Sequence, residues 1–118
     1  MKKMLIAVAL AGAALAGAGT ASASNDAVTH VRWTGAKCID VEVTSYANPR
    51  ITATRMICGG DWSLGDGNIW SGDLFGANPI MGAADHIECW IERGDWVVWS
   101  SGANAGDGHD VNCLRRAT

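Results

Sequence analysis

Four cysteines are the feature that most constrains how this chain can fold. They lie at positions 38, 58, 89 and 113 of 118 residues, and none belongs to a C-x-x-C pair. Their spacing matches no common zinc site, so an even set of four predicts two disulfides. Of the three possible connectivities, we favour joining the first cysteine to the second and the third to the fourth. Each of these pairs, Cys38–Cys58 and Cys89–Cys113, brackets one plausible strand–turn–strand unit.

The first 23 residues have the layout of a bacterial secretory signal peptide. Lys2 and Lys3 are followed by an apolar run from Met4 to about Ala18, and the segment ends in the small-residue triplet 21–23 (Ala-Ser-Ala). This order of basic, apolar and small residues is typical of a cleaved leader. The apolar run is shorter than the ~20 residues that a membrane span needs. We therefore expect a secreted, extracellular protein of residues 24–118, a single domain that is not inserted in a membrane after cleavage.

Size and charge narrow the classes of partner. A domain this short has a small core, and each predicted disulfide should add roughly 3 kcal/mol to its stability. The formal net charge is −3 for the whole chain, and it falls to −5 when Lys2 and Lys3 leave with the signal peptide. No basic run remains to bind nucleic-acid phosphates or an anionic lipid surface. Nucleic acid and membranes are therefore poor candidates as partners.

Short alternating runs broken by glycine predict strands throughout the mature chain. The clearest is Ile39–Thr44, in which apolar residues alternate with polar ones. The other runs lie at 31–33, 50–58, 87–91, 96–100 and 111–114, with a possible short strand at 68–71 inside a Gly/Asp/Asn-rich segment at 59–85. This pattern predicts an all-β fold: a small disulfide-stapled β-sandwich or barrel of about six or seven short strands.

The hairpin around residues 92–95 can be assigned two faces. If residues 93–94 form a two-residue turn, or 92–95 a four-residue loop, Ile91 pairs with Trp96 and Trp90 with Val97. The disulfide cysteine should lie inside. The expected core face is then Ile87, Cys89, Ile91, Trp96 and Val98, and the second face is His86, Glu88, Trp90, Val97 and Trp99. Trp90 and Trp99 would form an aromatic patch if the second face meets solvent, or a second packed layer if both faces are covered.

No catalytic signature is present, and we expect neither an enzyme nor a cofactor. Ser63 lies in Asp-Trp-Ser-Leu-Gly, which lacks the strand-to-helix turn of a nucleophile elbow. The three histidines, His30, His86 and His109, have no obvious catalytic frame.

Gly-Asp pairs crowd the stretch GDWSLGDGNIWSGD at residues 60–73. Residues 66–68 (Asp-Gly-Asn) supply only the first two ligand positions of an EF-hand loop, and no glutamate closes it. A second polar cluster at 104–110 also lacks a known spacing. We favour tight turns over calcium sites, because glycine reaches positive φ freely and aspartate accepts hydrogen bonds from its own turn. Calcium binding in either loop stays open as the alternative.

Tryptophan is the residue that turn chemistry does not explain, since six of the eight aromatic residues are Trp. Indole faces stack on sugar rings, and neighbouring carboxylates and amides bind sugar hydroxyls. We therefore predict a non-catalytic module that binds an extracellular or cell-envelope glycan. The candidate stacking residues are Trp62, Trp70, Trp90 and Trp99, with Asp61, Asn68 and Asp73 as polar contacts.

The alternative is a secreted effector that targets a protein, since tryptophan is also a leading hot-spot residue of protein interfaces. Such a protein would be an enzyme inhibitor or an antibacterial or host-directed effector, with the 60–85 segment as its contact. The two neighbouring disulfides in a small secreted β domain are similar to the layout of bacterial proteinaceous amylase inhibitors. The Trp-Arg-Tyr contact triplet of that family is absent here, so the resemblance is one of architecture and implies no residue roles.

Overall fold

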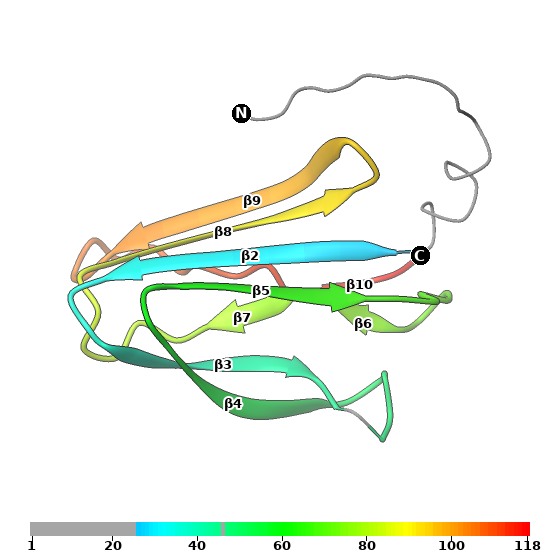
Figure 1. The fold of residues 1–118 in the computed structure, drawn as a ribbon, viewed down its shortest axis with the longest axis horizontal. Helices are drawn as coiled ribbons and strands as arrows, with labels where there is room; N and C mark the ends of the chain where they lie inside the picture. The colour runs from blue at the N-terminus through cyan, green and yellow to red at the C-terminus, as the bar shows by residue number, and fades with distance from the viewer. Residues whose placement is uncertain (1–25, 46) are drawn as a thin grey trace.

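The computed structural model describes residues 26–45 and 47–118 (Figure 1). The expected signal peptide and its cleavage point lie outside these residues. The described chain is all-β, as predicted, and contains no helix that could span a membrane. Its strands are β2 (Ala27–Thr34), β3 (Cys38–Thr44), β4 (Thr52–Cys58), β5 (Asp61–Asp66), β6 (Leu74–Phe75), β7 (Ala77–Pro79), β8 (His86–Arg93), β9 (Trp96–Asn104) and β10 (Arg115–Arg116).

These strands form three antiparallel sheets that share one core. The largest has the order β5-β2-β8-β9, the second β4-β3-β7, and the third is the short pair β10-β6. Figure 1 shows the four-stranded sheet in the upper half, β3 and β4 at the bottom, and β6, β7 and β10 between them. The arrangement is a small disulfide-stapled β-sandwich.

Alternation along the strands determines which side of each sheet is buried. In β2 the buried and the more exposed residues alternate along the whole strand, with Val31 and Trp33 on the buried side. Strands β3 and β8 do the same with Val41 and Ile87. The inward faces of the sheets therefore pack together, and the other face of the four-stranded sheet is left to solvent.

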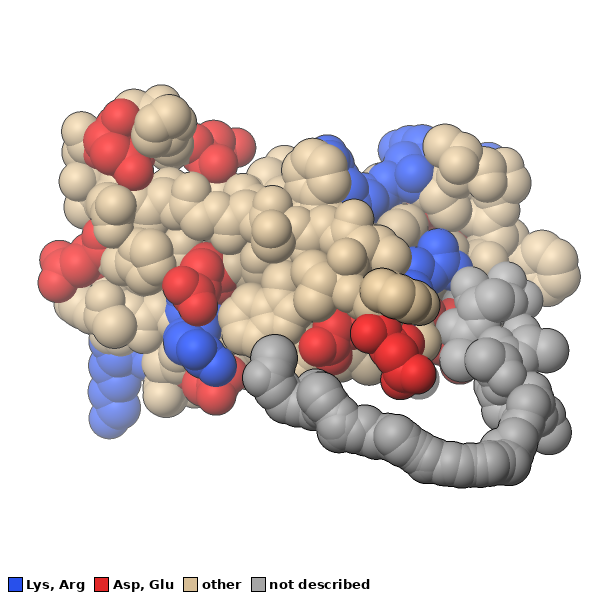
Figure 2. Space-filling model, turned by 90° about the horizontal axis from the view of Figure 1, so that it is seen from above, with Lys and Arg blue, Asp and Glu red and all other residues tan. Residues whose placement is uncertain are grey.

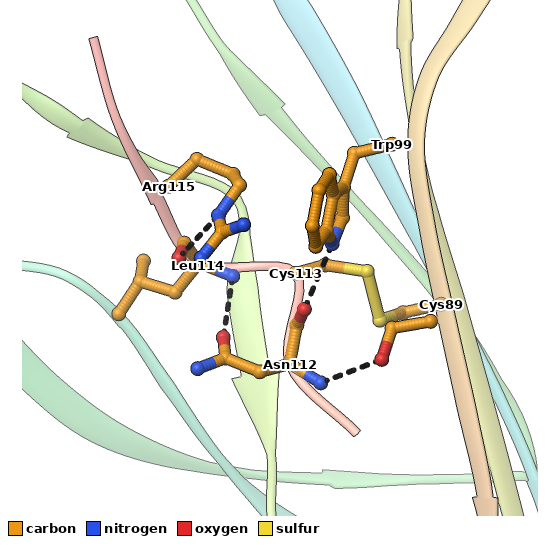
Figure 3. Close-up of a disulfide and its surroundings, with 7 residues drawn as sticks. Cys89, Trp99, Asn112, Cys113, Leu114 and Arg115 are labelled. Atoms are coloured by element: carbon orange, nitrogen blue, oxygen red, sulfur yellow. Dashed lines mark hydrogen bonds between the residues drawn. A yellow bond between two sulfur atoms is a disulfide. The ribbon is translucent and has the colours of Figure 1, made fainter. Parts of the chain in front are cut away.

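Both predicted disulfides are confirmed. Cys38 and Cys58 are directly opposite each other on β3 and β4. Cys89 lies in the middle of β8, and its bond to Cys113 attaches the C-terminal segment to the inner face of the four-stranded sheet (Figure 3). One bond thus joins two strands that are already paired, whereas the other joins separate layers.

The segment at 59–85 contains more structure than its composition indicates. It forms β5, β6 and β7, whereas residues 68–71, expected as a short strand, lie in a loop and turn. The last strand is Arg115–Arg116, not the expected 111–114. Four of the strands in the described residues were therefore not predicted: β6, β7 and β10 have only two or three residues, too few to show alternation, and β5 lies in a Gly/Asp-rich stretch that was interpreted as turns.

The predicted register of the β8–β9 hairpin is wrong. The turn is Gly94-Asp95, with Gly94 at a φ of 63°, so that Arg93 pairs with Trp96. A bulge then places Ile91 opposite Trp99. Trp99 therefore lies on the inner side of the sheet, and Trp90 on the outer side. Trp96 and Val98, expected in the core, are 76% and 50% exposed, because the hairpin tip extends past the core.

Thr29 provides a test of the core. Its side chain is fully buried, and its hydroxyl has no hydrogen-bond partner in the described structure. Thr29→Val should raise the free energy of unfolding by about 1 kcal/mol, because the shape is kept and an unpaired polar atom is removed. Thr44→Val is the matched control. It should lower stability by about 1 kcal/mol, because Thr44 Oγ1 donates to the Leu74 carbonyl at 2.8 Å. Urea unfolding would measure both, and a destabilised Thr29→Val would contradict this account.

The two disulfides should differ in their contribution to stability. Their sequence separations of 20 and 24 residues predict nearly equal chain-entropy terms. Cys89 and Cys113 are buried and join layers, whereas Cys58 is exposed. The double alanine variant at 89 and 113 should therefore lose more than the variant at 38 and 58, within the usual 2–5 kcal/mol. Equal losses in denaturant titrations would show that only loop closure matters.

Candidate binding site on the outer sheet face

The outer face of the four-stranded sheet carries a tryptophan at its centre. Trp90 projects from β8 and is opposite His30 on β2 and Ser100 on β9. Charged side chains lie around it on the same face, among them Arg32 on β2 and Glu88 and Glu92 on β8. An aromatic side chain set among charged groups on an open sheet face is an unusual arrangement for a residue that only packs.

On the β2 side, the indole of Trp90 is fixed by two neighbours. The His30 ring stacks on it, with centroids 4.9 Å apart and an interplanar angle of 17°. The Arg32 guanidinium carbon lies 5.2 Å from the indole centroid, within range of a cation–π interaction. These contacts hold Trp90 in one orientation.

On the β9 side, small residues leave space beside the same indole. Ser100 and Gly102 occupy the outer face there, and with Trp90, Glu88 and Val97 they line a groove of about 590 Å³. It is a shallow groove that is open to solvent, not an enclosed cavity. Trp90 is thus supported on one side and accessible on the other, with a carboxylate and a hydroxyl nearby.

A chain of hydrogen bonds crosses three strands beside this groove. His30 Nε2 lies 2.9 Å from Glu92 Oε1, and Ser63 Oγ lies 3.0 Å from His30 Nδ1. Neither His30 nor Ser63 belongs to a sequence motif that predicts this contact. They are brought together by the β2–β5 register, in which they lie opposite each other, and the sequence does not reveal this register.

Serine, histidine and carboxylate are also the residue types of an acyl-transfer triad. That chemistry needs N–H donors 2.7–3.1 Å from the developing oxyanion. The backbone N–H groups of β5 lie in the plane of the sheet, whereas the Ser63 side chain projects out of it. The β5 backbone therefore supplies no such donors above Ser63, and the hydrogen bonds are better explained as fixing the His30 ring against Trp90.

Glu88, which lines the groove, is held by two basic side chains. Its carboxylate lies 3.2 Å from His86 Nε2 and 3.7 Å from an Arg32 nitrogen. His86 Nδ1 is 2.7 Å from the Asn104 side-chain oxygen. The bond to Glu88, and next the bond to Asn104, raise the pKa of His86 above its usual value. The groove thus contains a carboxylate that has two basic neighbours.

None of the other sequence-based candidates lines the groove. Asp61 lies on the same outer face, opposite Arg32 on β2. Trp62 is opposite Val31 on the inner side, is half-buried, and has the Arg55 guanidinium 5.7 Å from its ring. Trp99, also on the inner side, donates to the Asn112 carbonyl at 2.9 Å.

Three further candidates lie at one end of the molecule, in the loop between β5 and β6. Trp70 is 70% exposed, whereas Asp73 is only 8% exposed and accepts a hydrogen bond from the Trp70 N–H. Asn68 adopts a positive φ of 53°, and its N–H donates to Asp26. The seven predicted ligand-binding residues are therefore divided among the outer face, the inner face and this loop.

The aspartates of the two candidate calcium loops mainly accept backbone hydrogen bonds. Asp107 accepts from the N–H groups of Asn104 and His109, and these bonds lower its pKa. Asp66 accepts from the Gly76 N–H, but burial raises its pKa. In the described residues no three acidic, histidine or cysteine side chains come close enough to hold a metal.

Comparisons with known proteins identify no relative: no family model, no curated protein and no solved structure matches this chain.

The His86–Glu88 contact generates a pH prediction. In an NMR titration, the pKa of His86 should lie above 6.5, and Glu88→Gln should bring it back toward 6.5. Because the folded-state pKa is raised, the contact stabilises the fold fully below pH 6.5, and this effect is lost as the pH rises through the pKa of His86. Glu92→Gln is the control, since Glu92 contacts His30 instead. An unchanged His86 titration in Glu88→Gln would contradict the assignment.

Proposed function

We propose that this protein is a secreted binding module that recognises an extracellular or cell-envelope glycan through the outer face of its four-stranded sheet. The observation that carries this proposal is the setting of Trp90. Its indole is supported by His30 on one side and opens on the other onto the groove above Ser100 and Gly102. A fixed aromatic side chain next to an open groove can bind a ring with little loss of side-chain entropy.

The chemistry around Trp90 fits a sugar. The apolar face of a pyranose ring would stack on the indole, and its hydroxyls would reach the Glu88 carboxylate and the Ser100 hydroxyl. Apolar contact surface with a few well-placed polar groups is the usual composition of such sites. Binding of this kind needs no cofactor and no reaction.

A protein target is the second candidate, and strand β9 favours it. β9 is an edge strand of its sheet, nine residues long and without a charged side chain. Residues 96–99 (Trp-Val-Val-Trp) are all exposed large hydrophobics. An extended segment of a target protein could add to such an edge by backbone pairing. This contact would lie on β9 instead of the 60–85 segment expected from the sequence.

Two variants test the glycan proposal. Trp90→Ala should weaken binding to a responsive polysaccharide at least about tenfold, or about 1.4 kcal/mol. Gly102→Val should do the same while keeping the tryptophan, since an added side chain would occupy the groove and Gly102 does not have a positive φ. Affinity electrophoresis and a glycan array would measure binding.

Trp96→Ala is the matched control, because Trp96 is more exposed than Trp90 and does not line the groove. It should leave glycan binding unchanged. No response of the folded protein across a broad glycan array would refute the glycan proposal. Loss of a stoichiometric protein partner in Trp96→Ala, but not in Trp90→Ala, would favour the β9 edge.

A further inference from the structure

A second aromatic side chain is presented to solvent by a rigid turn at residues 70–73. The Trp70 carbonyl accepts from the Asp73 N–H at 2.9 Å, and the Asp73 carboxylate accepts from the Trp70 N–H at 3.0 Å. Gly72 adopts a φ of +91°, which the turn requires and which disfavours other residues. Trp70 is nevertheless 70% exposed. The turn therefore fixes the backbone at Trp70, whose large apolar side chain does not pack in the core.

Two arginines from separate segments hold this turn in place. Arg50 donates to the Ser71 carbonyl at 3.1 Å, and Arg116 donates to the Gly72 carbonyl at 2.7 Å. The Gly72 N–H in turn donates to the Ala117 carbonyl at 2.9 Å. Each guanidinium has five N–H donors, and the carbonyl bond uses one of them. Both side chains are exposed, so they retain donors for a ligand.

A pocket of about 240 Å³ lies against Trp70. Its lining includes Phe75, Arg93 and Arg116, and the guanidinium carbon of Arg93 is 5.4 Å from the Phe75 ring. The chain is acidic overall, yet Arg50, Arg93 and Arg116 lie around this turn and pocket. Basic side chains also gather on the upper right of the surface in Figure 2.

The acidic groups near the pocket only partly offset the positive charge of these three arginines. Asp73 is buried, and its carboxylate is already bonded to the Trp70 N–H and lies 3.9 Å from the Arg50 Nε. Thr118, the last residue, also lines the pocket. The local surface therefore combines an exposed indole with arginine donors, in contrast to the acidic and neutral groups that line the Trp90 groove.

We propose that the Trp70 pocket is a separate binding site for an anionic sugar, in which a carboxylate or phosphate ester pairs with Arg116 and the sugar ring stacks on Trp70. Arginine suits these anions because its planar fork matches two of their oxygens. The site lies in the β5–β6 loop, away from the Trp90 groove, so the two proposals can fail independently.

The test is an NMR titration with three small probes: methyl glucuronide, glucose 6-phosphate and uncharged methyl glucoside. The two anionic probes should shift the Trp70 indole N–H and the Arg116 side-chain signals, and the neutral probe should not. Arg116→Gln should weaken anion binding about tenfold or more, because it removes a charge-assisted pair. The turn should be kept, because the Gly72–Ala117 backbone bond and both Trp70–Asp73 bonds do not use the Arg116 side chain, and the backbone amide signals of residues 70–73 would show this.

Arg55→Gln is the matched control, since Arg55 contacts Trp62 and does not line the pocket. It should leave anion binding unchanged, as should Trp90→Ala. Binding of one anion only would identify whether carboxylate or phosphate is recognised. Three results would overturn the proposal: equal shifts with the neutral sugar, no shift of Trp70 at millimolar probe, or an equal loss in Arg55→Gln.

Discussion

The bond between Cys89 and Cys113 is the constraint on which the rest of the structure depends. It ties the middle of the central strand β8 to the C-terminal segment (Figure 3). The Cys113 backbone then pairs with Ala77 through two hydrogen bonds, of 2.9 and 3.3 Å. The approach is so close that a Cβ on Gly76 would lie 1.9 Å from the Cys113 carbonyl oxygen, so only glycine fits there. The tail is thereby fixed between the two larger sheets, and the small core is closed at this end.

The fixed C-terminal tail, residues 112–117, also determines how two of the tryptophans, Trp99 and Trp70, are held. Asn112, just before the disulfide, accepts the indole N–H of Trp99, and the Arg115 guanidinium carbon lies 4.2 Å from the same ring. In the next two residues, the Arg116 side chain and the Ala117 carbonyl form hydrogen bonds with Gly72, in the turn that carries Trp70. The same segment therefore fixes the Trp99 ring, which stays 40% exposed, and holds the turn on which Trp70 is 70% exposed. Their different roles follow from hydrogen bonds to a short tail that shows no periodicity in the sequence.

The sequence was sufficient for features that depend on local chemistry, and insufficient for those that depend on register. The even number of cysteines and their placement predicted both disulfides, and the alternation of apolar and polar residues predicted the all-β class. The two faces of β8 were predicted correctly, but Trp99 on β9 was placed on the wrong face, because side chains alternate with a period of two and one bulged residue exchanges the faces beyond it. The neighbours of Trp90 were out of reach for a related reason: His30 and Ser63 meet only through the pairing of strands distant in sequence.

The same bulge bears on how the exposed edge of β9 is tolerated. Edge strands usually avoid further pairing through charged residues or distortions. The opposite edge of this sheet, β5, has Asp61 and Asp66, whereas β9 has no charge at all. The irregularity opposite Ile91 and Glu92 interrupts the regular ladder in the middle of the Trp-Val-Val-Trp run. A single inserted residue thus turns Trp99 toward the tail and makes the edge irregular at one point, so that a second chain could pair only with the shorter stretches on either side of the bulge.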